Sequence, residues 1–318
     1  MGLTHWDEVE GRRSEKGEMG AEWQRLGNAA GSIGVGVNRV RIDPGRLSTP
    51  PHSHSVSEEI VFVLGGSGLS WQDEQVYEVR PGDCIVHVAD HEEHTLRGGP
   101  DGLDVLIYGT RHPTEFGWLP RSAAVRLGWP WVVGRTDDPW DVEAAAEPLA
   151  FGDPSPRPAN IVNVEDVPAY PDDPTSKTLA DAAGSVRTGL HWSRVPPGAE
   201  LAVPHCHSAE EEIFVVLEGS GTLELWPSPV AAERGAVRED TALRPGHVVA
   251  RPPGTKIAHC LRGGDDGMVI LTYGTREPND IAYYPRSNKI YWRGVGLIAR
   301  LDHVEYWDGE VRPPGSAA

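Results

Sequence analysis

The sequence predicts an all-β protein made of two jelly-roll β-barrels that arose by internal duplication. Short apolar stretches alternate with turn signals rich in Gly and Pro, which is typical of antiparallel barrels and sandwiches. One segment of about a hundred residues is present twice in the 318-residue chain. Both copies carry the pattern His-x-His-x4-Glu, at His52 to Glu59 and at His205 to Glu212. We therefore expect two copies of one β domain.

The first copy shows the expected strands in order. They are predicted at 35–42, 60–64, 68–72, 84–88, 94–97 and 103–108. Turn signals such as Asp43-Pro44-Gly45 and Arg80-Pro81-Gly82 separate them. Residues before the repeat read as a polar extension, with one helical turn near 18–26.

The repeat runs through most of each half. Residues 29–32 recur 153 positions later, and this offset holds to Gly66 and Gly219. An insertion at 227–240 then reads as a long hairpin loop. Beyond it the offset is 165, and 102–111 matches 267–276. We predict an N-terminal domain with an extension over 1–125, a Pro-rich linker with a short helix at 141–146 over 126–160, and a C-terminal domain with an extension over 161–318.

The two His-x-His pairs are the most informative residues. In a strand, side chains at i and i+2 point to the same face, so each pair directs two imidazoles to one place. The glutamate follows five residues later, where a straight strand would place it on the opposite face. A turn must therefore intervene, with Glu59 and Glu212 each opening a new strand. A further histidine occurs in matching surroundings at His94 and His259.

This spacing, HxHx4Ex6G followed by a turn and a later histidine, resembles the two motifs of the cupin superfamily. Two copies in one chain look like a bicupin, which implies two cupin-like barrels related by a pseudo-twofold axis. The resemblance also implies two four-ligand metal sites. These are His52, His54, Glu59 and His94, and His205, His207, Glu212 and His259.

Three imidazoles and one carboxylate suit a divalent first-row transition metal. Four-coordinate Zn would be saturated by these ligands, whereas octahedral Fe, Mn or Ni would keep two positions open; Cu is also compatible with the ligands. We expect up to two metals per chain. The resemblance implies a metal-dependent oxidoreductase of dioxygenase type acting on a small organic substrate. The alternatives are a redox-neutral lyase, decarboxylase or isomerase, and a non-catalytic binding module.

The halves differ next to the expected ligands. Arg187 and His191 in the second copy replace Gly34 and Asn38 of the first. If this strand face points inward, Arg187 holds an anionic substrate and His191 moves protons; if it points outward, both are surface residues. The pair leads us to expect the chemistry in the second half.

Charge and composition limit the partners. The net charge of −18 and the lack of a basic stripe argue against nucleic acid. No apolar run reaches the length of a membrane span, and the N-terminus does not resemble a signal peptide. Three cysteines, Cys84, Cys206 and Cys260, fit small buried residues in a reducing compartment. We expect a cytoplasmic protein with a small-molecule substrate, and the sequence is compatible with homo-oligomers.

Overall fold

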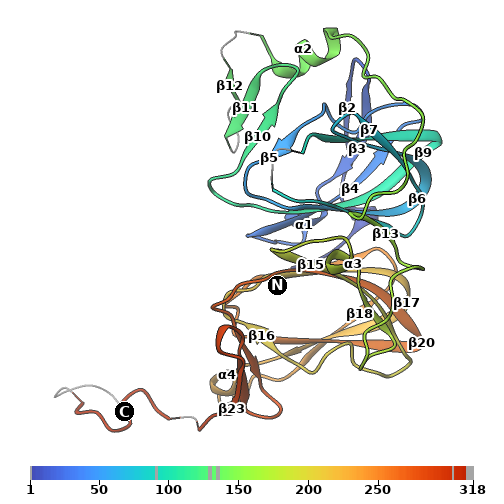
Figure 1. Cartoon of the computed structure of the whole chain (residues 1–318). Coiled ribbons are helices and arrows are strands. Elements are labelled where there is room, and N and C mark those ends of the chain that lie inside the picture. Colours follow the sequence, from blue (N-terminus) through green and yellow to red (C-terminus); the bar gives the residue numbers. More distant parts are fainter. Residues whose placement is uncertain (1, 90–91, 128–130, 134–136, 303, 313–318) are drawn as a thin grey trace.

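Two β-barrels stack on each other in the computed structural model, the first above the second (Figure 1). The structure describes residues 2–89, 92–127, 131–133, 137–302 and 304–312. Four antiparallel sheets account for the strands of these residues, with only short helices between them. The prediction of an all-β, duplicated fold is confirmed.

The first barrel consists of an eight-stranded sheet and a four-stranded sheet. The large sheet has the order β13-β8-β6-β9-β4-β3-β2, and β7 also pairs with β6. Its strands are β2 (Arg12–Lys16), β3 (Met19–Gln24), β4 (Val35–Ile42), β6 (Glu59–Gln72), β7 (Gln75–Val79), β8 (Asp83–His87), β9 (His94–Thr110) and β13 (Ile161–Asn163). The small sheet contains β5 (Ser53–His54), β10 (Phe116–Leu119), β11 (Ala124–Leu127) and β12 (Trp131–Val133).

The second barrel repeats this arrangement with a seven-stranded sheet of order β1-β19-β17-β20-β15-β14, in which β18 pairs with β17. Its strands are β1 (Gly2–His5), β14 (Ser176–Thr178), β15 (Thr188–Val195), β17 (Glu212–Trp226), β18 (Glu239–Leu243), β19 (His247–Arg251) and β20 (Ala258–Thr275). The small sheet contains β16 (Cys206–His207), β21 (Ile281–Tyr284), β22 (Lys289–Trp292) and β23 (Leu297–Arg300).

The helices are brief connectors. They are α1 (Leu26–Ala29), α2 (Pro139–Ala145), α3 (Leu179–Ala182) and α4 (Pro229–Glu233), with 3-10 turns η1 (Trp6–Glu8) and η2 (Arg293–Val295). The helix expected at 141–146 is thus present as α2. Asp138 caps its N-terminus by accepting a hydrogen bond from the Trp140 N–H.

The glycine of the repeated motif bends the longest strands. Gly66 has φ of 77°, and a Cβ there would lie 2.3 Å from the Gly102 carbonyl oxygen. Gly219 stands in the same situation against Gly267. Each lies at a register shift between two long strands, β6 with β9 and β17 with β20. The bulge curves the sheet without ending the ladder, so the pairs expected at 60–64 and 68–72, and at 94–97 and 103–108, are single bent strands.

Two segments differ from expectation. The helical turn expected near 18–26 is wrong, because Met19–Gln24 is strand β3 and pairs with both β2 and β4. The insertion at 227–240 contains the short helix α4 as well as the start of β18. Ser228 caps α4, with Pro229 in its first turn, which is the favoured place for proline in a helix.

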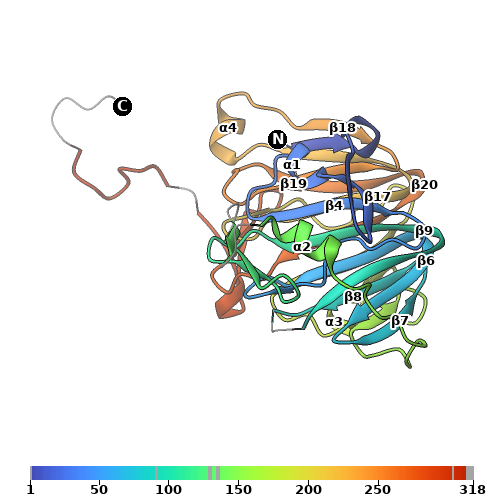
Figure 2. The same ribbon diagram turned by 90° about the horizontal axis from the view of Figure 1, so that it is seen from above.

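Two strands cross the predicted domain limits. Strand β1, near the N-terminus, pairs with β19 of the second barrel, and β13 pairs with β8 of the first. Figure 2 shows the N-terminal segment lying over the second barrel. The limits at 125 and 160 stay a prediction, and each barrel borrows one edge strand from the other half of the chain.

Alternation along the strands divides the apolar residues among three cores. Val61 and Val63 belong to a cluster inside the first barrel, and Phe214 and Val216 to one inside the second. Alternation places these four side chains on the same strand face as Glu59 and Glu212. The intervening residues, among them Ile60 and Ile213, form a third cluster shared by both halves.

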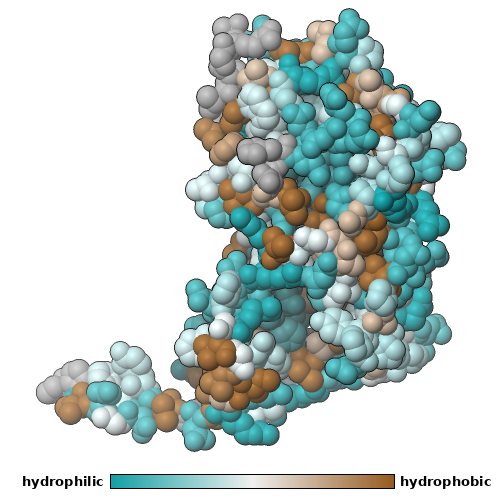
Figure 3. All heavy atoms as spheres, in the orientation of Figure 1, coloured by the Kyte–Doolittle hydropathy of each residue, from teal (hydrophilic) through white to brown (hydrophobic). Residues whose placement is uncertain are grey.

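The surface is mainly polar on the face that Figure 3 shows, with scattered apolar patches. Among the described residues, no helix is both long and apolar enough to cross a membrane. A cytoplasmic location stays a prediction. So does homo-oligomer formation, although Trp292, Leu297 and Ile298 near the chain end are exposed.

Candidate metal centres

The first candidate site gathers all four predicted ligands. His52 forms a bridge with His94, while Glu59 and His94 are the first residues of β6 and β9. One side-chain ligand atom from each of the four residues lies within 4.8 Å of the others. The Nε2 atoms of His54 and His94 are each 3.6 Å from a Glu59 carboxylate oxygen. Three strands and the turn before β6 thus bring the residues together as predicted.

The second candidate site uses the corresponding elements, but here only His205, Glu212 and His259 have ligand atoms that all lie within 4.8 Å of one another. His205 bridges to His259, and Glu212 opens β17. The Nε2 atoms of His205, His207 and His259 lie 3.8, 3.4 and 2.9 Å from Glu212 Oε2. The predicted turn between the His-x-His pair and the glutamate is present in both halves.

Hydrogen bonding leaves the inward nitrogen of these imidazoles available. The Nδ1 atoms of His52, His94 and His205 lie 3.1, 3.1 and 2.8 Å from the carbonyl oxygens of Pro50, Glu92 and Val203. A carbonyl can only accept, so Nδ1 donates and Nε2 carries the lone pair. The Nε2 atoms of His54, His94, His207 and His259 are buried without a hydrogen-bond partner among the described residues. Such orphaned acceptors beside a carboxylate fit a divalent metal.

Two acidic residues that the sequence reasoning missed orient the second histidine of each pair. The His54 Nδ1 lies 3.3 Å from Glu115, and the His207 Nδ1 lies 2.7 Å from Asp280. Glu115 also accepts hydrogen bonds from the N–H groups of residues 55–57, and Asp280 from those of 209 and 210. Each carboxylate therefore fixes both the imidazole and the turn. A signal existed, since Glu115 and Asp280 are 165 positions apart.

The imidazoles differ in their protonation. Burial lowers the pKa of His52 to about 3, and those of His94 and His259 to about 4. Burial also disfavours the charged form of His54, but Glu115 and Glu59 outweigh it and raise the pKa of His54 to about 9. In the same way Asp280 and Glu212 overcome burial and raise the pKa of His207 to about 10.

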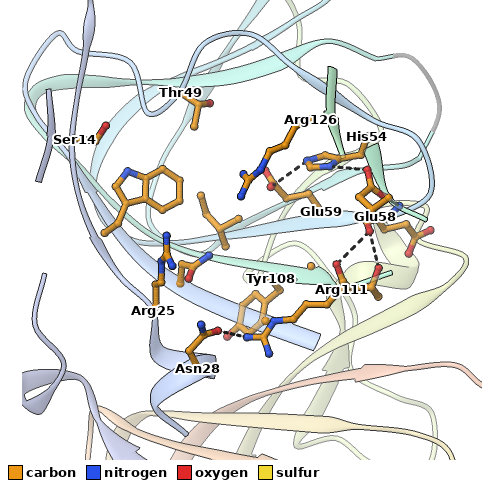
Figure 4. A pocket seen from close by; sticks show the side chains of 18 of the residues that line it. Ser14, Arg25, Asn28, Thr49, His54, Glu58, Glu59, Tyr108, Arg111 and Arg126 are labelled. Carbon is orange, nitrogen blue, oxygen red and sulfur yellow. Dashed lines mark hydrogen bonds and ion pairs between the residues drawn. The ribbon is translucent and has the colours of Figure 1, made fainter. Parts of the chain in front are cut away.

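A cavity of about 580 Å³ adjoins the first site. Arg25, Arg111 and Arg126 line it together with His54 and Glu59 (Figure 4). Arg111 is engaged with the Ser32 carbonyl and the Asn28 side chain. Burial lowers the pKa of Arg126, and the charge of Arg25, which lines the same cavity, lowers it further. Such a pair favours an anionic ligand.

The second site opens to a different cavity, of about 390 Å³. His191 lines it with the ligands His205, Glu212 and His259, beside Phe214. Ser176, Ser193 and Thr272 supply hydroxyl groups. No Arg or Lys is among the described residues that line this cavity. Burial lowers the pKa of His191, which favours a neutral imidazole able to accept a proton.

The expectation that Arg187 lies beside the second site together with His191 is wrong. It lies outside the second cavity, in the turn before β15, with an exposed side chain. Its Nη1 donates to the Val56 carbonyl oxygen of the first barrel, 3.0 Å away, and its N–H donates to Glu58. Period-two counting fails here because the regular strand begins only at Thr188. Only His191 of the pair reaches the cavity.

Known proteins with this architecture were found by sequence and by structure. Residues 38–101 match the cupin domain family. An oxalate decarboxylase from Bacillus subtilis superimposes with a TM-score of 0.57 at 15% identity, covering 88% of this chain and 79% of that one. A structure from work on the Mn(II) centres of the same enzyme gives 0.56 at 15%, covering 88% and 78%. The formate complex of Lactobacillus farciminis oxalate decarboxylase gives 0.56 at 13%, covering 87% and 86%.

No curated protein matches the chain closely enough to report a relationship. The likeness to the solved structures, at such low identity, concerns the fold. The chain has the fold of a bicupin, with two cupin-like barrels in one polypeptide. The resemblance to the cupin superfamily, drawn from the His-x-His-x4-Glu spacing, is thereby confirmed.

Proposed function

We propose that this protein is a metal-dependent bicupin enzyme that acts on a small carboxylate in the cavity of the first barrel, by redox-neutral lyase chemistry of the decarboxylase type. The observation that carries this proposal is the placement of Arg25 and Arg126 in one cavity with His54 and Glu59. The structural neighbours named oxalate decarboxylases support the reaction class.

The metal would be held by His52, His54, Glu59 and His94. When bound, a divalent ion such as Mn supplies Lewis-acid polarisation of a substrate oxygen. The guanidinium groups of Arg126 and Arg25 bind and orient the carboxylate, since a planar fork of donors matches its two oxygens. In decarboxylation the carbon–carbon bond next to the carboxylate breaks. The electron pair stays on the remaining fragment, which takes up a proton.

The cavity of the second barrel suits a different role. Its described lining offers hydroxyl groups and the imidazole of His191 in place of guanidinium groups. We therefore propose that the carboxylate binds in the first half, and not in the second half as the sequence led us to expect. We retain His191 as the candidate for proton transfer if the second site is also active.

Turnover by the metal-loaded protein tests the proposal. Protein reconstituted with Mn²⁺ or Fe²⁺ is incubated with small mono- and dicarboxylates, including oxalate, while carbon dioxide and dissolved oxygen are measured. We expect carbon dioxide release without net consumption of dioxygen. Arg126→Gln is expected to raise KM by about tenfold or more, because it removes a charge-assisted contact to the substrate.

Arg80→Gln serves as the matched control, since Arg80 lies outside this cavity in ion pairs with Glu165 and Asp166. It should leave KM unchanged. Dioxygen consumed in proportion to product would favour the dioxygenase prediction instead. Metal-loaded protein without turnover of any carboxylate would contradict the proposal.

A further inference from the structure

The residue before each predicted glutamate ligand is also a glutamate, and its side chain contacts the other barrel. Glu58 precedes Glu59, and Glu211 precedes Glu212. Neighbouring side chains in a strand point to opposite faces, so Glu59 and Glu212 face their own barrels. Glu58 and Glu211 share the orientation of Ile60 and Ile213, which lie in the core between the barrels. Both carboxylates are almost completely buried, at 1% and 2% exposure.

Glu58 accepts hydrogen bonds from the turn that precedes β15 in the second barrel. Its oxygens lie 2.8 Å from the Val186 N–H, 3.1 Å from that of Arg187 and 3.0 Å from that of Thr188. The hydroxyl groups of Ser185 and Thr188 donate as well, at 2.7 and 2.9 Å. A buried carboxylate with so many donors is firmly fixed in place.

Glu211 makes the reciprocal contact with the first barrel. Its oxygens accept from the N–H groups of Ile33, Gly34 and Val35, at 2.9, 2.5 and 3.2 Å. These residues form the turn before β4, the counterpart of the turn that holds Glu58. The exchange is isologous, as a twofold relation between the halves requires. The two contacts differ in their hydroxyl donors, because Glu58 accepts from Ser185 and Thr188, whereas the first barrel has Val35 in place of Thr188 and its Ser32 hydroxyl donates to the Val35 carbonyl.

We propose that Glu58 and Glu211 are positioning residues, by which each barrel fixes the metal-binding glutamate of the other. The inference rests on the proposed metal sites. Glu58 and Glu59 share a peptide bond at the start of β6, so the turn at 185–188 determines where that strand begins. A change in this turn of the second barrel should therefore weaken metal binding in the first barrel, while leaving the site of its own barrel unaffected.

Metal affinity at each site, measured separately, tests this crossed dependence. His205→Ala with His207→Ala leaves only the first site, and His52→Ala with His54→Ala leaves only the second. Each background is titrated with Mn²⁺ by calorimetry, and bound metal is measured by elemental analysis. In the first-site background we expect Glu58→Gln to weaken binding by about tenfold or more, as for other residues that orient ligands. Thr188→Val should weaken it by about three- to tenfold.

The second-site background gives the matching half of the test. There Thr188→Val should leave Mn²⁺ affinity unchanged, and Glu211→Gln should lower it by about tenfold. Ser155→Ala is the control, because the Ser155 hydroxyl donates to Gln75, outside the contacts of Glu58 and Glu211. It should alter neither site. Thermal unfolding of each metal-free variant separates a loss of positioning from a loss of folding.

Unchanged first-site affinity in both Glu58→Gln and Thr188→Val would overturn the inference, with the proposed metal sites left intact. So would equal losses at the two sites in Thr188→Val, since a general destabilisation has no reason to select the site of the other barrel. If the unaltered protein takes up no Mn²⁺, the inference and the proposed function fail together.

Discussion

At the scale of single residues, His54 and His207 determine how many protons are released when a metal binds. Their pKa values are raised to about 9 and about 10 by the carboxylates around them, against the effect of burial. In the metal-free protein both are therefore protonated at pH 7.5. A metal needs the Nε2 lone pair, so it must displace that proton. We expect release of about two protons per chain at pH 7.5, and affinity that rises with pH up to about 9.

Calorimetric titration with Mn²⁺ in buffers of different ionisation enthalpy measures this release. Glu115→Gln removes a carboxylate that holds the raised pKa of His54, so it should reduce the release to about one proton. Glu165→Gln is the control and should release as many as the unaltered chain, because the Glu165 side chain is exposed and pairs with Arg80 outside both cavities. A release near zero at pH 7.5 would show that both imidazoles are already neutral.

The clustering of these histidines and glutamates was predictable because the residues repeat at a fixed spacing. Glu115 and Asp280 keep the same offset of 165, but their role depends on a turn brought close by folding, which the spacing does not show. Arg187 shows the limit of period-two counting, which holds only inside a regular strand and fails in the turn before β15. The arginines that line the first cavity are Arg12, Arg13, Arg25, Arg111 and Arg126. They come from separate parts of the chain, so no local sequence pattern unites them.

At the scale of elements, the strand opposite each metal-binding glutamate distinguishes the two sites. In the ladders Glu59 pairs with His87 of β8, whereas Glu212 pairs with Arg251 of β19. The His87 Nδ1 lies 2.6 Å from Glu92, and its ring stacks on His94 at 3.8 Å. Arg251 is 4% exposed and donates to the Ile257 carbonyl, 2.6 Å away. At the second site a permanent cation therefore occupies the strand-pairing position that an imidazole holds at the first.

This cation should make the second site the weaker one. Repulsion between a buried guanidinium and a divalent ion is substantial even at an effective dielectric constant of about 20. We expect Mn²⁺ to bind the first site about tenfold more tightly, which the two single-site backgrounds measure directly. Arg251→Gln should bring the two affinities closer together. Equal Mn²⁺ affinities of the two sites in the unaltered protein would contradict this explanation. So would a second site that binds Mn²⁺ more weakly in Arg251→Gln than in the unaltered protein.

The strands themselves were largely visible in the sequence, since β4 has the predicted bounds and Glu59 and Glu212 open β6 and β17 as expected. The prediction misjudged the structural role of the glycines. Gly66 and the Gly-rich segment of β9 read as strand ends, yet they form bulges within continuous ladders. The edge strand β1 lacked any signal, because its pairing with β19 joins residues far apart in the chain.

At the scale of the whole molecule, three features join the halves into one structure. Apolar residues of both barrels form a common core, in which the rings of Tyr108 and Tyr273 lie 5.0 Å apart. Strands β1 and β13 each pair with the other barrel. Glu58 and Glu211 add the buried polar contacts described above. Domains with separate cores can unfold separately, but here neither half keeps its full set of contacts when the other unfolds.

We therefore expect the metal-free protein to unfold in one cooperative transition. In scanning calorimetry the ratio of calorimetric to van't Hoff enthalpy should be close to one. Ile213→Ala, in the common core, should lower the stability by about 2–5 kcal/mol and shift that single transition as a whole. Val237→Ala is the control, because Val237 is 77% exposed and should change stability by less than about 0.5 kcal/mol. Two resolved transitions, with Ile213→Ala moving only one of them, would show that the barrels unfold independently despite their shared core.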